Sequence, residues 1–422
     1  MSTPISFEPP RGMRDFYPED MRWRNRVFDA WRLSATRFGF QPYDACVVES
    51  LALLERKSGE EVADQIYHFE DKSGRKLALR PEMTPTLARM IAARQGQLTF
   101  PVKWFTVAQC FRYERMTRGR KREHYQWNLD VIGEAHVSAE AEILAAAAES
   151  LSAMGMPNDA YRIHVNNRAL LAELLQRSGI AAEHHAAVFL ALDKRGKISD
   201  EEITALLIAE GLNSDSITKT FELLAIQTLD QAELLVGEDS PAIATIRELF
   251  ALAELYGVAD RLVFDVAVIR GLAYYTGIVF EAFDVNRKFR AIFGGGRYDH
   301  LLTAIGGAAM PAVGLGFGDV VVVEILKEIL GEQVAAERTG VVIGYMFSEQ
   351  RDAATRLANR LRTNGESVDL MLAQLKPKQF FSRASSGTYA DAIFIGPDDV
   401  SCGKARRKHL ATREETDCLL PT

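Results

Sequence analysis

The chain has 422 residues, of which 47% are hydrophobic and 25% are charged, so it is a globular protein of two or three domains and not a disordered tail. The formal net charge of −7 excludes a polycation that binds any nucleic acid through phosphate neutralisation alone. The N-terminus lacks the apolar core of a signal peptide and no stretch reaches the ~18 apolar residues of a membrane span, so we expect a cytoplasmic protein without a membrane partner.

The first region, residues 1–168, is predicted to mix helix and strand. Residues 19–38 carry apolar side chains near helical spacing, and Gly39 ends this amphipathic helix. Residues 66–85 and 102–114 then alternate between polar and apolar side chains, as antiparallel strands do. The four cysteines of the chain are scattered, with no CxxC pair, so we expect no metal site built by the chain itself.

The remaining chain is predicted to form three further parts. Residues 169–257 are helical in composition and are predicted to be a helical module inserted in the first domain. Strand character returns within residues 258–330, where that domain resumes. Residues 340–422 alternate as β-α-β-α-β, which predicts a separate small α/β domain.

The segment Cys110–Asp130 joins a basic loop to an alternating strand. Six basic side chains lie between Phe111 and Arg122, and the following strand carries polar side chains at His124, Gln126, Asn128 and Asp130. Since successive strand residues point to opposite faces, these polar residues share a face, as Arg112 and Glu114 are expected to do. A hairpin closed by the loop 115–121 would be a polar pocket under a cationic lid. A solvated charged hairpin is the alternative interpretation, and this segment alone leaves both open.

Three other motifs carry chemistry. In "LALRPEMTP", residues 77–85, Arg80, Glu82 and Thr84 are predicted to share one strand face, where a carboxylate and a hydroxyl would suit an ammonium group. In "VIRGLAYYTG", Arg270 precedes a glycine turn, from which its planar guanidinium could reach a phosphate. The glycines at 294–296 would let a ligand approach the backbone closely, although such runs also mark simple bends.

Together these motifs resemble those of class II aminoacyl-tRNA synthetases, and specifically of the histidyl-tRNA synthetase family. The segments that carry the resemblance run in the family's order from residue 10 to about 318, and they are "PRGMRDFYP", "LRPEMT", "FRYERMTRGRKREHYQWNLD", "RGLAYYTGIVFE", "GGGRYD" and "PAVGLGFG". Residues 340–422 are similar to the family's anticodon-binding domain. The resemblance implies an α+β fold, in which an antiparallel-sheet catalytic domain with a helical insertion precedes a C-terminal α/β domain.

The resemblance also implies a ligase. Histidine and ATP, with Mg²⁺ on the phosphates, would give histidyl-adenylate, and the acyl group would pass to the 3′ end of histidine tRNA. The implied histidine-binding residues are Glu82, Met83, Thr84, Gln126, Asp130, Tyr274 and Tyr275. The implied ATP-binding residues are Arg112, Glu114, Arg120 and Arg122, and the implied catalytic residues are Arg112 and Arg270. Family membership would also imply a homodimer that pairs through the region around "PRGMRDFYP".

Two positions depart from the family's pattern. Ala273 stands where most of these enzymes have an aspartate, which leaves the local support of Arg270 open. Val321 stands where motif 3 normally ends in an arginine that clamps ATP, and Arg297 is a nearby basic residue that could replace it.

Two other functions are therefore weighed against the ligase. One is a synthetase-like regulatory subunit, such as the one that serves ATP phosphoribosyltransferase, which senses histidine without activating it. Such subunits lack the anticodon-binding part, whereas residues 340–422 are present here. The other is a generic RNA-binding protein, which would not explain why Gln126, Asn128 and Asp130 alternate on one strand face. The sequence favours the ligase over both.

Overall fold

The computed structural model describes residues 6–55, 65–117, 119–195, 198–270, 275–331 and 338–421. It divides into two compact units, Met1–Ile329 and Leu330–Thr422. Within the described residues, no helix has both the length and the apolar character that crossing a membrane requires.

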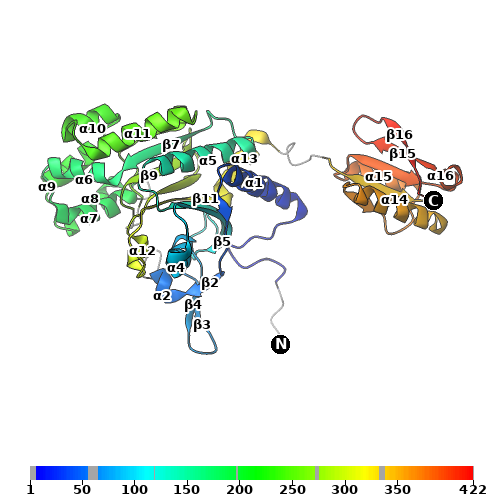
Figure 1. Ribbon diagram of the computed structural model, residues 1–422, viewed down its shortest axis with the longest axis horizontal. Coiled ribbons are helices and arrows are strands. Elements are labelled where there is room, and N and C mark those ends of the chain that lie inside the picture. Colours follow the sequence, from blue (N-terminus) through cyan, green and yellow to red (C-terminus); the bar gives the residue numbers. More distant parts are fainter. Residues whose placement is uncertain are drawn as a thin grey trace. The chain divides into compact units, whose positions relative to one another are not determined.

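An eight-stranded sheet forms the centre of the N-terminal unit (Figure 1). In spatial order its strands are β1 (Gln41–Pro42), β5 (Val102–Phe111), β6 (Glu123–Ile132), β11 (Ala312–Gly318), β10 (Phe293–Arg297), β9 (Ile278–Asp284), β7 (Tyr161–Asn167) and β8 (Leu262–Phe264). Neighbours are antiparallel except at the two edges, where β1 pairs with β5 and β8 pairs with β7 in parallel. A small second sheet has the order β2 (Val48–Ser50), β4 (Lys76–Leu79) and β3 (His68–Glu70).

The predicted hairpin is confirmed. Strands β5 and β6 are antiparallel, with Phe111 opposite Glu123. The apolar face of β6 packs against the helices α1 (Pro18–Arg37) and α5 (Ser138–Met154), since Trp127 stacks on Trp31 of α1 at a centroid distance of 6.2 Å. The polar face of β6 therefore looks away from these helices, toward the side of α4 (Thr84–Arg94).

The stretch after β7 is helical. Its helices are α6 (Arg168–Arg177), α7 (Ala182–Asp193), α8 (Asp200–Ala209), α9 (Ser214–Leu223), α10 (Leu229–Val236) and α11 (Pro241–Leu255). Polar caps start several of them, and Ser199 with Glu202 forms a full capping box at α8. The remaining short elements of this unit are α2 (Leu51–Glu55), η1 (Gln95–Gln97), η2 (Ala259–Arg261) and α12 (Leu301–Ala304), followed by the longer α13 (Asp319–Leu330).

The C-terminal unit has a five-stranded sheet of its own. The strand order is β13 (Val368–Leu370), β12 (Val341–Tyr345), β14 (Asp391–Ile395), β15 (Lys404–His409) and β16 (Glu415–Leu419). The first three strands are parallel, as the β-α-β-α-β pattern predicts, and β15 and β16 add an antiparallel hairpin that was not predicted. Its helical elements are η4 (Ser348–Gln350), α14 (Arg351–Thr363), α15 (Pro377–Ser386) and α16 (Pro397–Cys402).

Candidate active site

Four glycines open one face of the central sheet, namely Gly294 and Gly296 of β10 and Gly314 and Gly316 of β11. They alternate along their strands and pair with one another across the ladder, so they point to the same face. A Cβ atom built on Gly316 would lie 2.3 Å from Nε2 of Gln126, and one on Gly294 would lie 1.4 Å from Nη1 of Arg270. The space left by these missing Cβ atoms, which we call the glycine trough, is filled by polar side chains of β6 and by Arg270.

Asp130 and Gln126 reach the trough from β6. Asp130 lies opposite Gly314 and is only 1% exposed, and its Oδ1 atom accepts a hydrogen bond from the hydroxyl of Tyr298 at 2.5 Å. Gln126 lies on the same face, and its Oε1 atom is 3.2 Å from Nε2 of His124. The sequence does not predict Tyr298 as a site residue, although it directly follows the glycines and Arg297 in the motif "GGGRYD". The tyrosine therefore orients the carboxylate that was predicted to face the imidazole of histidine.

Arg270 approaches the trough from the opposite side. Its backbone φ is 52°, in the left-handed region that non-glycine residues rarely adopt. Its Nη1 atom donates to the carbonyl oxygen of Phe280 at 3.5 Å and lies 3.3 Å from Oε1 of Glu281, both on β9. The guanidinium carbon is 5.8 Å from the ring centroid of Tyr275, which is buried beside Gly296. Tyr274 and Ala273 lie outside the described residues.

The four predicted ATP-binding residues lie close together where the basic loop leaves and rejoins the hairpin. The Arg112 amide donates to the carbonyl of Arg122 at 2.9 Å, just beyond the last paired residues of β5 and β6. Glu114 forms an ion pair with Arg120 at 2.5 Å, and the Arg122 guanidinium stacks over Tyr113 at 3.8 Å. The prediction that Arg112 and Glu114 share a strand face is wrong, because β5 ends at Phe111. The loop closes on itself instead of extending the ladder.

The segment around Glu82 also departs from the predicted strand. Strand β4 ends at Leu79, and Thr84, with Pro85 after it, opens helix α4, so Arg80, Glu82 and Thr84 do not share one strand face. The Arg80 guanidinium donates to the backbone carbonyls of Gln109 and Ala45, each at 2.9 Å, which is a structural role.

Glu82, Met83 and Thr84 are all buried, and they lie beside the basic loop because Nε of Arg112 donates to the carbonyl of Pro81 at 2.9 Å. The Met83 side chain packs in an apolar cluster with Ala108 and Cys110. Glu82 and Thr84 are therefore the members of this segment whose polar atoms suit an ammonium group.

His124 and Asn128 complete the polar face of β6. Burial, followed by the charge of Arg112, lowers the pKa of His124 to about 3, so the imidazole is neutral near pH 7 and Gln126 is its partner. Asn128 is 2% exposed, and among the described residues its Oδ1 atom has no hydrogen-bond donor. The alternating pattern predicts that both residues lie on the polar face. Only the tertiary packing shows that the His124 imidazole is neutral and that Asn128, between Gln126 and Asp130, carries a buried acceptor.

Val321 lies under the basic loop. It is 8% exposed, and a Cβ atom built on Gly119 of that loop would lie 3.3 Å from its Cγ2. Two residues earlier, Asp319 forms an ion pair with Arg14 at 3.0 Å and accepts a hydrogen bond from the Tyr125 amide at 2.9 Å. Burial raises the pKa of Asp319, although the charge of Arg14 opposes this effect. Motif 3 thus contributes an apolar contact and a partly buried ion pair at this site.

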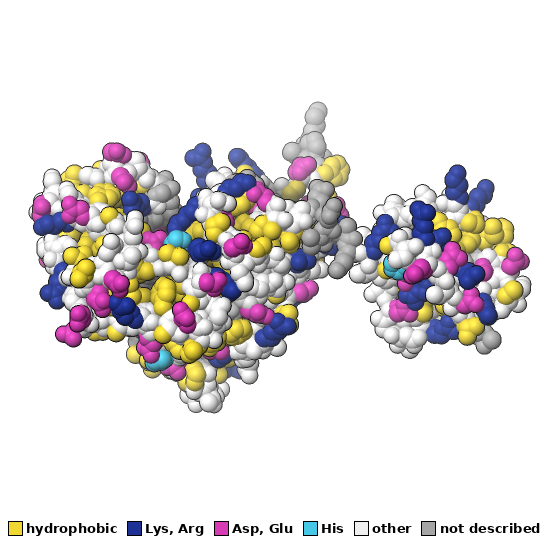
Figure 2. All heavy atoms as spheres, turned by 90° about the horizontal axis from the view of Figure 1, so that it is seen from above, with side chains coloured by type: hydrophobic (Ala, Val, Ile, Leu, Met, Phe, Trp, Pro, Cys, Tyr) yellow, Lys and Arg dark blue, Asp and Glu magenta, His cyan; other side chains and the backbone are white. Residues whose placement is uncertain are grey.

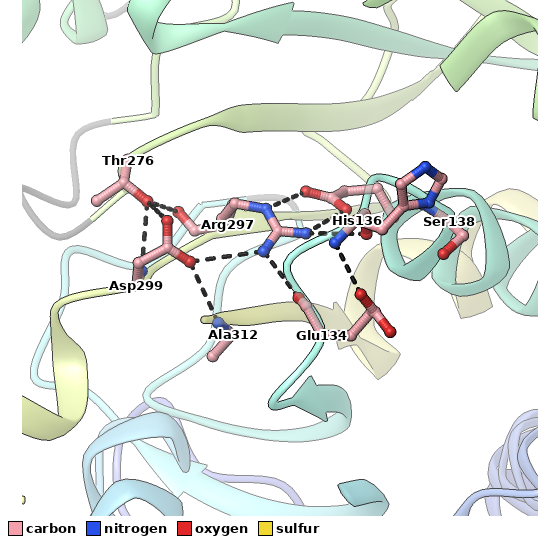
Figure 3. A network of polar contacts seen from close by, with 8 residues as sticks. Glu134, His136, Ser138, Thr276, Arg297, Asp299 and Ala312 are labelled. Carbon is pink, nitrogen blue, oxygen red and sulfur yellow. Dashed lines mark hydrogen bonds and ion pairs between the residues drawn. The ribbon is translucent and has the colours of Figure 1, made fainter. Parts of the chain in front are cut away.

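Arg297 does not replace the missing arginine (Figure 3). It alternates with Gly294 and Gly296 along β10, so its side chain leaves on the face opposite the trough. There its Nε and Nη2 atoms each lie 2.7 Å from the carboxylate of Glu140 on α5, and Nη1 donates to the carbonyl of Glu134 at 3.0 Å. A guanidinium held by two carboxylate oxygens and a carbonyl braces α5 against the sheet and is not available to ATP.

The site contains side chains of both charges. Asp130 and Glu82 supply buried carboxylates, whereas Arg112 and Arg270 supply cations at its two sides. Such an arrangement suits a substrate with a cationic end that meets a polyanionic one. No group of three or more His, Cys, Asp or Glu side chains within the described ranges is placed to hold a metal ion.

The chain is similar to known proteins over nearly its whole length. The family model for histidyl-tRNA synthetase matches residues 12–318. The chain is 42% identical over 412 residues to the histidine–tRNA ligase, chloroplastic/mitochondrial, of Arabidopsis thaliana, covering 97% of this chain and 85% of that protein. It is 38% identical over 421 residues to the histidine–tRNA ligase of Opitutus terrae, covering 98% and 96%.

Solved structures share the fold. A histidyl-tRNA synthetase from a Nostoc species superposes with a TM-score of 0.82 at 23% identity, over 99% of this chain and 97% of that one. A protein from Bacillus halodurans described as an ATP phosphoribosyltransferase regulatory subunit/histidyl-tRNA synthetase superposes with a TM-score of 0.77 at 23% identity, over 93% and 99%. The predicted α+β synthetase fold is confirmed, and the chain belongs to the histidyl-tRNA synthetase family.

Proposed function

We propose that this protein activates histidine with ATP and transfers it to histidine tRNA, with the glycine trough as the site of the first step. Relatives named histidine–tRNA ligase match nearly the whole chain, which supports this function over the regulatory one. The observation that carries the proposal is the convergence of Gln126, Asp130 and Arg270 on glycines of two neighbouring strands. Gln126 and Asp130 lie on β6, whereas Arg270 and the glycines lie far from β6 in the chain. Each of the three side chains supplies a group that one end of the substrate pair requires.

Histidine would bind along the polar face of β6. Asp130, oriented by Tyr298, would accept a hydrogen bond from an imidazole N–H, while Tyr275 would bound the ring. Gln126, with Glu82 and Thr84, would hold the α-ammonium group, because amide, carboxylate and hydroxyl oxygens all accept hydrogen bonds. Met83 would serve through packing, and Tyr274 remains assigned from its motif alone.

ATP would bind between the basic loop and Arg270. A carboxylate oxygen of histidine attacks the α-phosphorus, a new C(O)–O–P bond forms, and the bond to the pyrophosphate oxygen breaks. Arg112 and Arg270 would stabilise the charge that builds on the α-phosphate during this exchange, because both guanidinium groups are already held in place. Glu114, Arg120 and Arg122 would orient the rest of the nucleotide.

Mg²⁺ would be held mainly by the ATP phosphates. Carboxylate oxygens are the protein ligands that Mg²⁺ prefers, and Glu281 and Glu114 are the carboxylates beside the proposed phosphate path. Each of them now forms an ion pair with an arginine. The ion would neutralise phosphate charge, and this chain's own contribution would be those two oxygen donors.

The C-terminal unit would bind the tRNA anticodon. Lys404 and Arg406 of β15 are exposed, and Figure 2 shows further Lys and Arg side chains interspersed with acidic ones on the surface of this unit. Scattered surface cations suit the phosphates of RNA. We further propose a cytoplasmic homodimer that pairs through the region around Pro10–Pro18.

Histidine-dependent exchange between ATP and labelled pyrophosphate tests the proposal. The purified chain should support exchange with histidine, but not with other amino acids, and should charge a histidine tRNA transcript. Histidine binding without any exchange would instead indicate a sensor, and would refute the ligase. RNA binding without histidine binding would indicate a general RNA-binding protein.

A further inference from the structure

Arg270 has an unfavourable backbone conformation, which contacts from neighbouring residues must stabilise. A non-glycine residue in the left-handed region is strained, and it persists only where the surrounding structure determines its conformation. Its side chain reaches β9, but the backbone before it needs separate support. That support comes from the end of β7, where "VNNR", residues 165–168, leads into helix α6.

Asn166 and Arg168 donate hydrogen bonds to the backbone of residues 266–270. The buried amide of Asn166 donates from Nδ2 to the carbonyl oxygens of Val266 at 2.9 Å and Val268 at 3.1 Å. Nη1 of Arg168 donates to the carbonyl oxygen of Arg270 at 3.4 Å, and its backbone amide donates to that of Gly277 at 3.0 Å. One residue thus contacts the chain on both sides of residues 271–274.

The same guanidinium belongs to the helical region as well. The Arg168 guanidinium carbon lies 4.7 Å from the ring centroid of Phe189, which is on helix α7. Burial lowers the pKa of Arg168, and the charges of Asp193, at the end of α7, and of Tyr275 oppose this effect. The side chain therefore lies between α7 and the segment that carries Arg270.

We propose that Arg168 is a positioning residue that couples helix α7 to the catalytic arginine, fixing the backbone at Arg270 so that its guanidinium stays over the glycine trough. This inference rests on the proposed function for its effect on catalysis, but not for its effect on the structure. It makes the helical region part of the adenylation machinery, because a movement of α7 would be transmitted to Arg270 through one side chain.

Arg177 supplies a matched control. It lies on the same helix α6, and its Nη2 atom also donates to a backbone carbonyl, that of Val236 at 3.2 Å, but within the helical region. We expect Arg168→Ala to reduce kcat for pyrophosphate exchange by about tenfold or more while the KM for histidine changes less than threefold, since a donor that acts through Arg270 serves the transition state. Arg168→Lys should recover part of the rate, and Arg177→Ala should leave it unchanged.

A double-mutant cycle separates positioning from general stability. In an Arg270→Ala background, adding Arg168→Ala should lower the exchange rate less than twofold, because the group it positions is already gone. An equal loss in both backgrounds would overturn the inference. If Arg168→Ala does not fold, Phe189→Ala tests the same coupling from α7, with exposed Leu190→Ala on the same helix as its control.

Hydrogen–deuterium exchange provides a readout that does not need catalysis. Peptides covering residues 265–270 should exchange about tenfold faster in Arg168→Ala than in the wild type, and at the wild-type rate in Arg177→Ala. Unchanged protection in Arg168→Ala would refute the positioning role. If the wild-type protein shows no histidine-dependent pyrophosphate exchange, the ligase function fails while the protection of residues 265–270 still decides this inference.

Discussion

Replacing Gly316 by alanine should move Gln126 without unfolding the protein. A Cβ atom at this position would lie 2.3 Å from the Gln126 Nε2 atom, whereas ordinary contacts begin at 3.4 Å, so the amide must move by about 1 Å. Gly316 does not have a positive φ, so alanine imposes no backbone strain there. The atom that must yield is the far end of a flexible side chain, and the sheet can therefore remain intact.

The expected loss follows from the contact that Gln126 would make. A displacement of ~1 Å exceeds the ~0.5 Å within which a binding group must be held. A hydrogen bond to a charged partner such as the histidine ammonium contributes about 1.5–3 kcal/mol. Since 1.4 kcal/mol corresponds to a factor of ten, the Kd for histidine should rise by about 10- to 150-fold.

Calorimetric titration with histidine, alongside thermal unfolding, measures both effects. Gly318→Ala is the control, because this glycine lies two residues further along β11 and a Cβ atom there meets no atom within 4 Å. We expect the control to bind histidine like the wild type and both variants to unfold within a few degrees of it. A Gly316→Ala protein that is fully folded and binds histidine within twofold of the wild type would refute the role of Gln126.

Three further predictions concern the same site. Arg270→Ala should slow single-turnover histidine adenylation by about 10²- to 10³-fold with little change in the Kd for histidine. The control is Arg413→Ala, because Arg413 also has a positive φ but lies in the other unit. An Arg270→Ala protein that adenylates histidine at the wild-type rate but has a lowered Tm would contradict the catalytic role. Asp130→Asn should weaken histidine binding at least tenfold and reduce discrimination in pyrophosphate exchange, because a neutral amide is a poorer acceptor; unaltered selectivity would remove Asp130 from the pocket. The pKa of His124 is about 3 in the folded protein, against an ordinary value of 6.5. Between these two pH values the unfolded chain binds a proton that the folded protein does not bind. The free energy of unfolding therefore falls as pH falls, by at most about 1.4 kcal/mol per pH unit. His124→Phe should therefore lose less Tm than the wild type between pH 7 and pH 5, and an equal loss would show that this histidine is not neutral in the fold.

Local patterns predicted the hairpin because its two strands follow one another directly in the chain. Strand alternation separates Gln126 and Asp130 from Trp127, and the stacking of Trp127 on Trp31 confirms which face is apolar. The same rule failed for Glu82 and Thr84, since alternation describes only residues that stay in a strand. Here the strand ends at Leu79 and a helix begins at Thr84, so the spacing of two had no structural meaning.

By itself the sequence determined the hairpin, the family motifs and the residue types that can bind an amino acid and a phosphate. Only the tertiary structure decided which of them meet, because the sheet order β6-β11-β10-β9 brings together strands far apart in the chain. Asp130 is oriented by a tyrosine 168 residues away, and Arg297, which lies beside the trough in sequence, is held on the opposite face by a glutamate 157 residues away. The sequence could not show that the glycines form a trough, because the side chains that fill the space above them come from distant parts of the chain.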